Sequence, residues 1–213
     1  RLVYSRIENC KSNGEIDHPS VRHILRHLNL DRGVEIHHDG DLPARSGMGS
    51  SSAFTVGLLH SLHALQGRMP SKEQLARESI HIEQNLVKEV VGSQDQVMAA
   101  YGGLRHVNFL PHGEIAVCPL TIGLDRIRDL NAHLRLFYTG IKRTASDVAQ
   151  TYAGYSGTRQ RQLHRMEEFR EEGLAILKSR QDLAPFGKLL HEAWKVKRSL
   201  GANVSNAYVD GLY

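Results

Sequence analysis

The feature that most constrains the fold is a strongly apolar run, Ser50–Leu65, which directly follows a loop of glycines and serines. At helical spacing its apolar side chains surround most of the circumference; they are Phe54, Val56, Leu58, Leu59, Leu62 and Leu65. A surface helix carries one apolar stripe, whereas a helix that is apolar on most sides is buried. We therefore expect a central helix with other elements packed around it.

The loop before this helix, Gly47–Ser52, reads GMGSSS. Glycine tolerates positive φ and lets a ligand approach the backbone closely. Free N–H groups and the helix dipole make a helix N-terminus an anion site. No lysine follows at the Walker spacing, so a phosphate bound here needs Mg²⁺ and basic groups from elsewhere. A flexible turn before a serine-capped helix explains the same residues, and this segment alone leaves both interpretations open.

Periodic patterns elsewhere predict a mixture of strands and helices. Helices are expected within His18–Leu30 and after Ser71, which lies three residues before Gln74 as in a capping box. Alternating residues predict a short strand ahead of the Asp39-Gly40 turn, and a hairpin in LRHVNFL and EIAVCPL, joined by PHGE. A further strand is predicted at Leu134–Gly140.

The pattern after that strand is mainly helical. Helices are expected at Thr144–Tyr155, Gln162–Arg180 and Pro185–Leu200, and from Ser205 onward. Strands and helices in the first part followed by helices favour an α+β fold with two lobes. We place an N-terminal lobe at 1–130 and a C-terminal lobe at 131–213.

The composition excludes several classes of protein. The chain has 213 residues, 40% hydrophobic and 23% charged, with a formal charge of +4. These values are typical of a globular protein that handles small anions, and no run of Lys and Arg suggests a nucleic-acid binder. No apolar run is long enough to cross a membrane. Cys10 and Cys118 fit no metal or redox spacing, which predicts a reducing compartment, most simply the cytoplasm.

Two carboxylates stand out further along the chain. Glu83 lies next to apolar positions near the inner face of its helix, and Asp95 lies between Gln94 and Gln96 after a Gly-Ser turn. A carboxylate at a loop-to-helix junction, among amides that can orient it, is a candidate general base. The alternative is that Asp95 and Ser93 cap the following helix.

A third segment, Tyr138–Gln150, ends a predicted strand in Thr139-Gly140 and continues with Lys142 and Arg143. Two cations in a strand-to-helix turn can hold a phosphate. A solvated basic turn explains the same residues.

Taken in order, these segments resemble a known family. PARSGMGSSSA, then Ile-Glu, Gln-Asp-Gln and Tyr-Thr-Gly-x-x-Arg are similar to the motifs of the GHMP small-molecule kinases, with Met48 for the usual Leu and Ser52 for the first Ala. Within that superfamily, GSQDQVMAAYGGL, FYTGIKRTAS and the C-terminal LLHEAWKVKRSLGANVSNAYVDGLY look closest to the D-glycero-D-manno-heptose 7-phosphate kinases.

The resemblance implies roles for the residues. The loop residues would wrap the phosphates of ATP; they are Pro43, Ser46, Gly47, Met48, Gly49, Ser50, Ser51 and Ser52. Ser51, or its neighbour Ser50, would reach Mg²⁺ together with Glu83. Asp95 would take the proton of the sugar hydroxyl or orient it. The substrate contacts expected are Gln94, Gly140, Lys142 and Arg143, the two cations facing the 7-phosphate of the sugar.

The fold implied has an N-terminal lobe of the ribosomal S5 domain 2-like type and a ferredoxin-like C-terminal lobe. An N-terminal strand and loop and a C-terminal glycine-rich motif of the family are absent from this sequence, which therefore reads as incomplete at both ends. The expected partners are ATP and a sugar phosphate, without nucleic acid or membrane, and a homodimer is allowed. Alternatives are a 1-kinase for an unphosphorylated sugar such as fucose or galactose, and a catalytically silent sensor.

Overall fold

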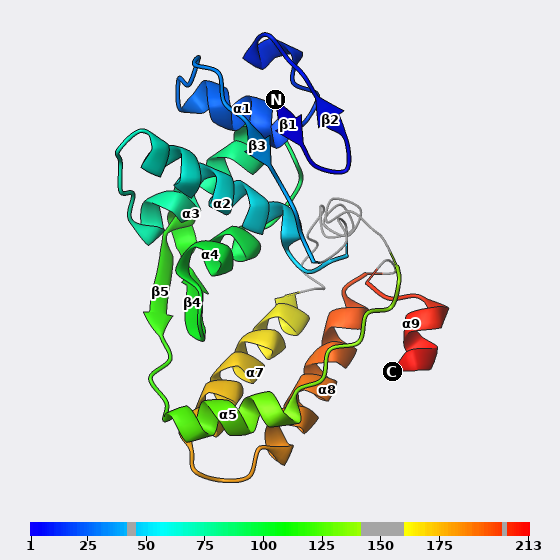
Figure 1. Ribbon diagram of the computed structural model, residues 1–213. Coiled ribbons are helices and arrows are strands. Elements are labelled where there is room, and N and C mark those ends of the chain that lie inside the picture. The colour runs from blue at the N-terminus through cyan, green and yellow to red at the C-terminus, as the bar shows by residue number, and fades with distance from the viewer. Residues whose placement is uncertain (42–45, 142–159, 202–203) are drawn as a thin grey trace. The chain divides into compact units, whose positions relative to one another are not determined.

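The computed structural model describes residues 1–41, 46–141, 160–201 and 204–213 (Figure 1). The chain divides into two compact units. The first holds Arg1–Arg105 with a short return segment that begins at Gly140. The second holds His106–Thr139 and the helices nearer the C-terminus. The predicted lobe boundary at residue 130 stays a prediction.

The first unit is built mainly from helices. These are α1 (Pro19–His27), α2 (Ser50–Leu65), α3 (Lys72–Ile80), the π-helical turn η2 (His81–Leu86) and α4 (Gln94–Tyr101). Proline occupies the first position of α1, where its missing N–H costs nothing. Val21, Ile24 and Leu25 form the buried face of that helix.

A small sheet lies beside these helices. Its strands are β1 (Leu2–Val3), β2 (Ile7–Glu8) and β3 (Ile36–His37), in the order β2-β1-β3 among the described residues. β1 pairs antiparallel with β2 and parallel with β3, where Leu2 lies opposite Ile36. A short 3₁₀ turn, η1 (Asn13–Glu15), precedes α1.

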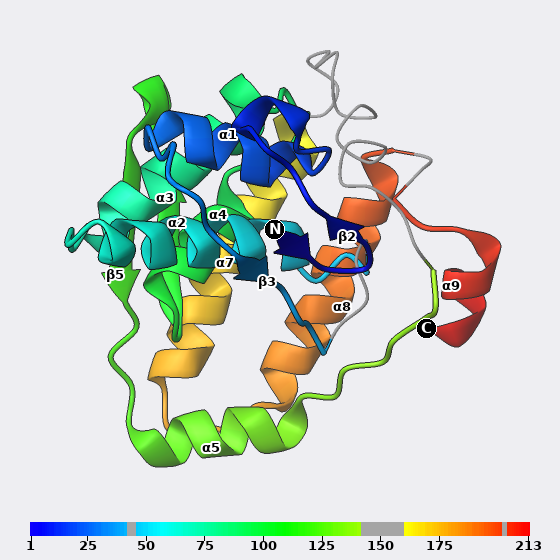
Figure 2. The same ribbon diagram turned by 45° about the horizontal axis from the view of Figure 1, so that its top comes forward.

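α2 is the central helix that its sequence predicts. Leu59 is fully buried, and Val56, Leu58 and Leu62 are buried beside it. α1, α3 and α4 all contact α2, and Figure 2 shows α2, α3 and α4 side by side. Because α2 is held on several sides, the direction of its N-terminus is fixed by the core.

The second unit contains a hairpin followed by helices. Its elements are β4 (Arg105–Phe109), the turn η3 (Pro111–Gly113), β5 (Ile115–Pro119), α5 (Leu124–His133), α7 (Gln160–Lys178), α8 (Ala184–Ser199) and α9 (Ala207–Leu212). The core of this unit gathers around Leu120, Leu130, Leu177 and Leu183. Gly173 of α7 packs against Leu189 of α8, which lets these two helices approach closely.

Most of the predicted elements are confirmed, and so is the α+β class. The capping box is present, because Ser71 Oγ accepts a hydrogen bond from the Gln74 N–H at 3.1 Å. The strand predicted at Leu134–Gly140 is wrong, since these residues form neither a strand nor a helix and Leu136 and Phe137 are exposed. α5 was not predicted, and the helix expected at Thr144–Tyr155 lies outside the described residues.

Candidate active site

The glycine-serine loop meets α2 without a capping side chain. Gly47 and Gly49 have φ values of 76° and 69°, which other residues adopt only with strain. Gly49 is the N-cap of α2, and no described side chain caps it, so the serines lie inside the first turn. The serine-capped alternative is therefore not what the described residues form. The N–H groups of this first turn are free to bind an anion.

The other loop residues differ in exposure. Ser46 Oγ is buried without a described hydrogen-bond partner, whereas the Met48 side chain is exposed. Ser50 is half-buried and Ser51 is exposed. Pro43 lies outside the described residues. An exposed Ser51 hydroxyl beside free backbone N–H groups can reach a ligand in solvent.

Glu83 is one of the most buried charged residues described, with 2% of its surface exposed. It lies on η2, where Val87 N–H bonds to Ile82 O, the i→i+5 spacing of a π turn. Ser52 Oγ of α2 donates to Glu83 Oε2 at 3.0 Å, and Gln96 Nε2 of α4 donates to the same oxygen. One carboxylate oxygen thus joins three helical segments.

The second oxygen of this carboxylate is unpaired. Glu83 Oε1 is buried and has no described hydrogen-bond partner. Burial raises the pKa of Glu83 above its ordinary value of 4.5, while nearby polar groups of Thr55, Gln96 and Ser52 offset part of that rise. The buried Thr55 hydroxyl, which has no described hydrogen-bond partner of good geometry, is the neighbour that lowers the pKa of Glu83 most. A buried carboxylate oxygen without a partner is costly, which favours a site that a ligand completes.

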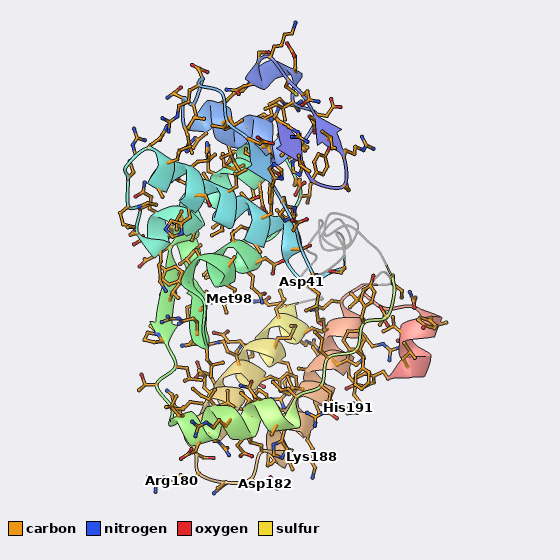
Figure 3. The ribbon with its side chains drawn as sticks, in the orientation of Figure 1. Asp41, Met98, Arg180, Asp182, Lys188 and His191 are labelled. Carbon is orange, nitrogen blue, oxygen red and sulfur yellow. The ribbon has the colours of Figure 1, made fainter. Side chains whose placement is uncertain are left out.

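Asp95 lies against the glycine loop. A Cβ built on Gly49 would lie 3.3 Å from Asp95 Cγ and 3.4 Å from Oδ2, so only glycine leaves ordinary room there. The Asp95 side chain is exposed on the first turn of α4. In Figure 3, Asp41 marks the chain just before the loop, and Met98 marks helix α4. A carboxylate is thereby placed beside the N-terminus of α2.

The remaining predicted residues are only partly placed. Gln94 is exposed at the start of α4, and Gly140 is exposed with a φ of 75°. Lys142 and Arg143 lie outside the described residues. Ser93 does not cap α4 with its side chain; its hydroxyl accepts from Gln84 Nε2 at 3.2 Å. Capping therefore does not account for Ser93 and Asp95.

These groups fit a nucleotide with a divalent cation. The free N–H groups suit phosphate oxygens, and an unpaired carboxylate oxygen near serine hydroxyls suits Mg²⁺. No group of three or more His, Cys, Asp or Glu residues that could hold a metal occurs among the described residues. A cation held here would therefore depend on few protein ligands, as Mg²⁺ bound jointly with phosphates does.

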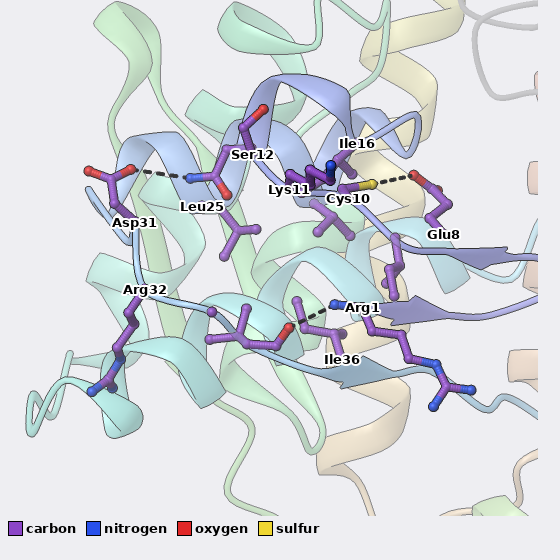
Figure 4. Close-up of a pocket in the computed structure, with 15 residues that line it drawn as sticks. Arg1, Glu8, Cys10, Lys11, Ser12, Ile16, Leu25, Asp31, Arg32 and Ile36 are labelled. Atoms are coloured by element: carbon purple, nitrogen blue, oxygen red, sulfur yellow. Dashed lines mark hydrogen bonds between the residues drawn. The ribbon is translucent and has the colours of Figure 1, made fainter.

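A cavity of ≈ 300 Å³ lies elsewhere in the first unit, between β1, η1, α1 and β3 (Figure 4). No predicted site residue lines it. Two of its polar side chains already have partners: Asn13 Nδ2 donates to Leu30 O at 3.0 Å, and Glu8 accepts from the backbone N–H groups of Asp17 and His18. The α2 loop, with unpaired donors and acceptors, is the better candidate.

Sequence reasoning missed two members of this cluster. It expected Ser51 or Ser50 beside the cation ligand, whereas the hydroxyl that contacts Glu83 is that of Ser52. It also expected Gln96 to orient Asp95, whereas the Gln96 amide contacts Glu83. Helix geometry could have separated Gln96 from Asp95. Consecutive residues of a helix point about 100° apart, so the side chains of Asp95 and Gln96 cannot share one direction.

Comparison with known proteins adds independent evidence. Residues 18–103 match the family model described as GHMP kinases N terminal domain. A D-glycero-alpha-D-manno-heptose 7-phosphate kinase of Campylobacter jejuni is 26% identical over 180 residues, which are 84% of this chain and 53% of that protein. A bifunctional fucokinase/GDP-fucose pyrophosphorylase of Arabidopsis thaliana is 26% identical over 187 residues, 85% of this chain and 18% of that protein.

Two solved structures share the fold. A D-glycero-D-manno-heptose 1-phosphate kinase from Bacteroides thetaiotaomicron has a TM-score of 0.67 and 22% identity, over 92% of this chain and 58% of that one. A mevalonate kinase has a TM-score of 0.60 and 14% identity, over 94% and 62%. The GHMP-kinase resemblance and fold predicted from the motifs are confirmed.

The chain spans about half the length of the heptose 7-phosphate kinase that it matches. Within the part that the structure describes, no helix combines the length and apolar character needed to cross a membrane.

Proposed function

Because residues 18–103 match the GHMP kinase N-terminal domain model, we propose that this chain acts in an ATP-dependent sugar kinase. The proposed reaction transfers the γ-phosphate to the anomeric hydroxyl of D-glycero-D-manno-heptose 7-phosphate and yields the 1,7-bisphosphate, a precursor for bacterial surface polysaccharide. The single observation that carries this proposal is the placement of Asp95 against Gly49 at the N-terminus of α2. That placement puts a carboxylate beside the proposed phosphate cradle.

In this mechanism the loop holds the phosphates and Glu83 holds the cation. The N–H groups of the first turn of α2 donate to phosphate oxygens, and the glycines let those oxygens approach the backbone. Glu83 and Ser51 provide oxygen ligands for Mg²⁺. When bound, Mg²⁺ offsets the negative charge that the phosphate oxygens carry during transfer.

Asp95 acts on the acceptor sugar. Its exposed carboxylate accepts the proton of the attacking hydroxyl or orients that hydroxyl toward the γ-phosphate. Phosphoryl transfer depends mainly on positioning and charge stabilisation, so the contribution of Asp95 is one of geometry and proton removal. Gln94 and Gly140, together with Lys142 and Arg143, are the proposed contacts for the sugar and its distal phosphate.

The heptose 7-phosphate is proposed as the acceptor because a relative that matches 84% of the chain is named a D-glycero-alpha-D-manno-heptose 7-phosphate kinase. A sugar 1-kinase for an unphosphorylated sugar is the second candidate, since fucokinases match a comparable share of the chain at 26% and 27% identity. The predicted cytoplasmic location and the homodimer stay predictions.

Substrate kinetics test the acceptor. ADP release is measured with ATP, Mg²⁺ and a panel of heptose 7-phosphate, unphosphorylated heptose, fucose and galactose. We expect the highest kcat/KM with heptose 7-phosphate, because the distal phosphate adds charge-assisted contacts. Turnover that is faster with fucose or galactose would favour the second candidate.

Substitution of the proposed base tests the mechanism. We expect Asp95→Asn to lower kcat by about 10²–10⁴-fold, the usual contribution of a general base. Nucleotide affinity should stay within about twofold, because the amide keeps the shape of the side chain. A variant with the kcat of the wild-type protein would contradict the assignment of Asp95.

A matched pair of glycine substitutions tests the contact itself. Gly47→Ala and Gly49→Ala both place a side chain at positive φ, but only the Cβ at Gly49 meets Asp95. Each change should cost about 1–2 kcal/mol of unfolding free energy through strain. We expect the kcat of Gly49→Ala to fall at least about tenfold below that of Gly47→Ala, measured under saturating ATP. Equal kcat values in the two variants would show that the contact between Gly49 and Asp95 is not important for catalysis.

A further inference from the structure

Gln96 is a buried amide of α4 that contacts Glu83 and not Asp95. Only 1% of its surface is exposed, in a helix whose preceding residue, Asp95, is exposed. Its Nε2 donates to Glu83 Oε2, while its own Oε1 is buried without a described partner. Only the nitrogen of the amide can donate to a carboxylate, so the orientation of the side chain is fixed by chemistry. This hydrogen bond therefore fixes the orientation of the Gln96 amide and the position of the Glu83 carboxylate.

The donors around Glu83 share one property, which is that they are neutral. Ser52 contributes a hydroxyl and Gln96 an amide, both to Oε2. A lysine or arginine in their place would neutralise the carboxylate and compete with a bound cation. Neutral donors orient the carboxylate and leave its charge available. They also occupy one oxygen and leave the buried Oε1 without a described partner.

The position of Gln96 on α4 connects two parts of the site. Asp95 lies against Gly49 of the loop, and the next residue, Gln96, reaches inward to Glu83 on η2. α4 also contacts both α2 and α3. A shift of Glu83 would therefore be transmitted to the helix turn that carries Asp95.

We propose that Gln96 is a positioning residue of the kinase: its amide holds the carboxylate of Glu83, which would be the cation ligand, and fixes α4 so that Asp95 faces the glycine loop. This inference rests on the proposed function. It assigns no chemistry to Gln96 itself, which acts through Glu83 and Asp95. Loss of such a support beside a metal ligand typically lowers metal affinity by about 10–100-fold.

The test uses Gln96→Met, which keeps the length of the side chain and removes the donor. A matched control is Gln66→Met, since Gln66 also uses its amide for a partly buried bond, to Leu28 O at 3.0 Å beside the far end of α2. Two quantities are measured: the affinity for ADP in EDTA, and the Mg²⁺ concentration that gives half-maximal stabilisation of the ADP complex in a thermal shift.

We expect Gln96→Met to raise the Mg²⁺ requirement at least about tenfold while the affinity for metal-free ADP changes less than about twofold. Gln66→Met should lower the melting temperature without raising the Mg²⁺ requirement. A general loss of structure would change the Mg²⁺ requirement of both variants to the same extent. If Gln96→Met does not fold, Gln96→Asn serves instead, because its shorter side chain falls short of Glu83 while keeping an amide.

Two outcomes separate the possible failures. If the wild-type protein binds Mg²⁺ and ADP but Gln96→Met and Gln96→Asn need no more Mg²⁺ than it does, the role of Gln96 is wrong and the kinase proposal stands. If the wild-type protein binds neither ADP nor Mg²⁺, the proposed function fails and the role of Gln96 fails with it.

Discussion

Two glutamates five residues apart on one helical segment have opposite surroundings. Glu78 on α3 accepts from Gln74 Nε2 at 2.8 Å and pairs with His63 Nε2 at 2.7 Å. Burial acts to raise the pKa of Glu78, but the hydrogen bonds from His63 and Gln74 outweigh it, so the pKa lies below 4.5. Glu83 on η2 has neutral donors on one oxygen, and burial raises its pKa.

The difference separates a carboxylate with partners inside the fold from the proposed cation ligand. The imidazole of His63 is almost fully buried and joins α2 to α3, so both oxygens of the Glu78 carboxylate already have hydrogen-bond partners within the fold. The charge of Glu83 has no basic partner among its described contacts, and one of its oxygens is unpaired. A buried carboxylate without a counter-charge is unfavourable until a cation binds. Burial of Glu83 therefore carries the free-energy cost of an uncompensated carboxylate, whereas the hydrogen bonds to Glu78 avoid that cost.

The largest effect should come from Glu83→Gln. We expect Mg²⁺-dependent kcat/KM to fall at least about 100-fold, because an amide replaces the charged ligand of the cation. The unfolding free energy of the ligand-free protein at pH 7 should be unchanged or higher, since no ionised group is then buried. Kinetics and chemical denaturation measure the two quantities. If Glu83→Gln lost stability and kept its activity, Glu83 would be a structural residue and not the cation ligand.

Glu78→Met should show the opposite profile. Removing the acceptor leaves the buried His63 ring unpaired, because its Nδ1 already has no described partner. We expect a loss of about 1–3 kcal/mol of unfolding free energy, with kcat within about twofold of the wild-type protein. Glu73→Met is the matched control: Glu73 forms an exposed pair with Arg77 at 2.9 Å on the same helix, worth about 0–1 kcal/mol. Equal losses in the two variants would show that the buried pair contributes nothing special.

The smallest effect is a difference in the pH dependence of stability, measured as unfolding free energy in buffers from neutral to acid pH. The folded pKa of Glu78 is lowered, so the unfolded state binds more protons in this window. The stability that Glu78 contributes is complete above its unfolded pKa and is lost as pH falls through the folded value. Glu78→Met should therefore lose less stability on acidification than the wild-type protein.

For Glu83 the sign is reversed. Its folded pKa is raised, so the folded state binds more protons and stability falls as pH rises from 4.5 through the folded value. Glu83→Gln removes this loss, and its stability should rise relative to the wild-type protein as pH increases. Parallel curves for both variants and the wild-type protein would argue against any difference between the two glutamates.

Periodicity predicted the elements that form the core and failed where the signal was weak or non-local. The apolar runs of α1 and α2 and the alternation of the β4–β5 hairpin are strong patterns, and each is confirmed. α5 buries only Leu130 among its ten residues, so its stripe is too sparse to recognise. The segment Leu134–Gly140 alternates like a strand, but pairing depends on contacts far along the chain, and the segment forms no strand while Leu136 and Phe137 stay exposed.

For the site, the sequence predicted residue types better than contacts. It singled out Glu83 and Asp95 and the loop, and the structure places Asp95 against Gly49. It could not assign Ser52 and Gln96 to the same oxygen of Glu83, because that contact depends on the angles at which three helical segments meet. The π turn is also invisible to a search for a period of 3.6 residues.

The π turn makes this helix sensitive to its length. An i→i+5 turn contains one more residue than an α turn, and both Ile82 and Glu83 are buried on it. Deletion of one residue from this turn would restore an α-helix and rotate everything beyond it by about 100° relative to α3. Conservative substitutions of apolar neighbours would leave that register intact. Over evolutionary time the segment should therefore accept many replacements and exclude single-residue deletions, an asymmetry that surface loops do not share.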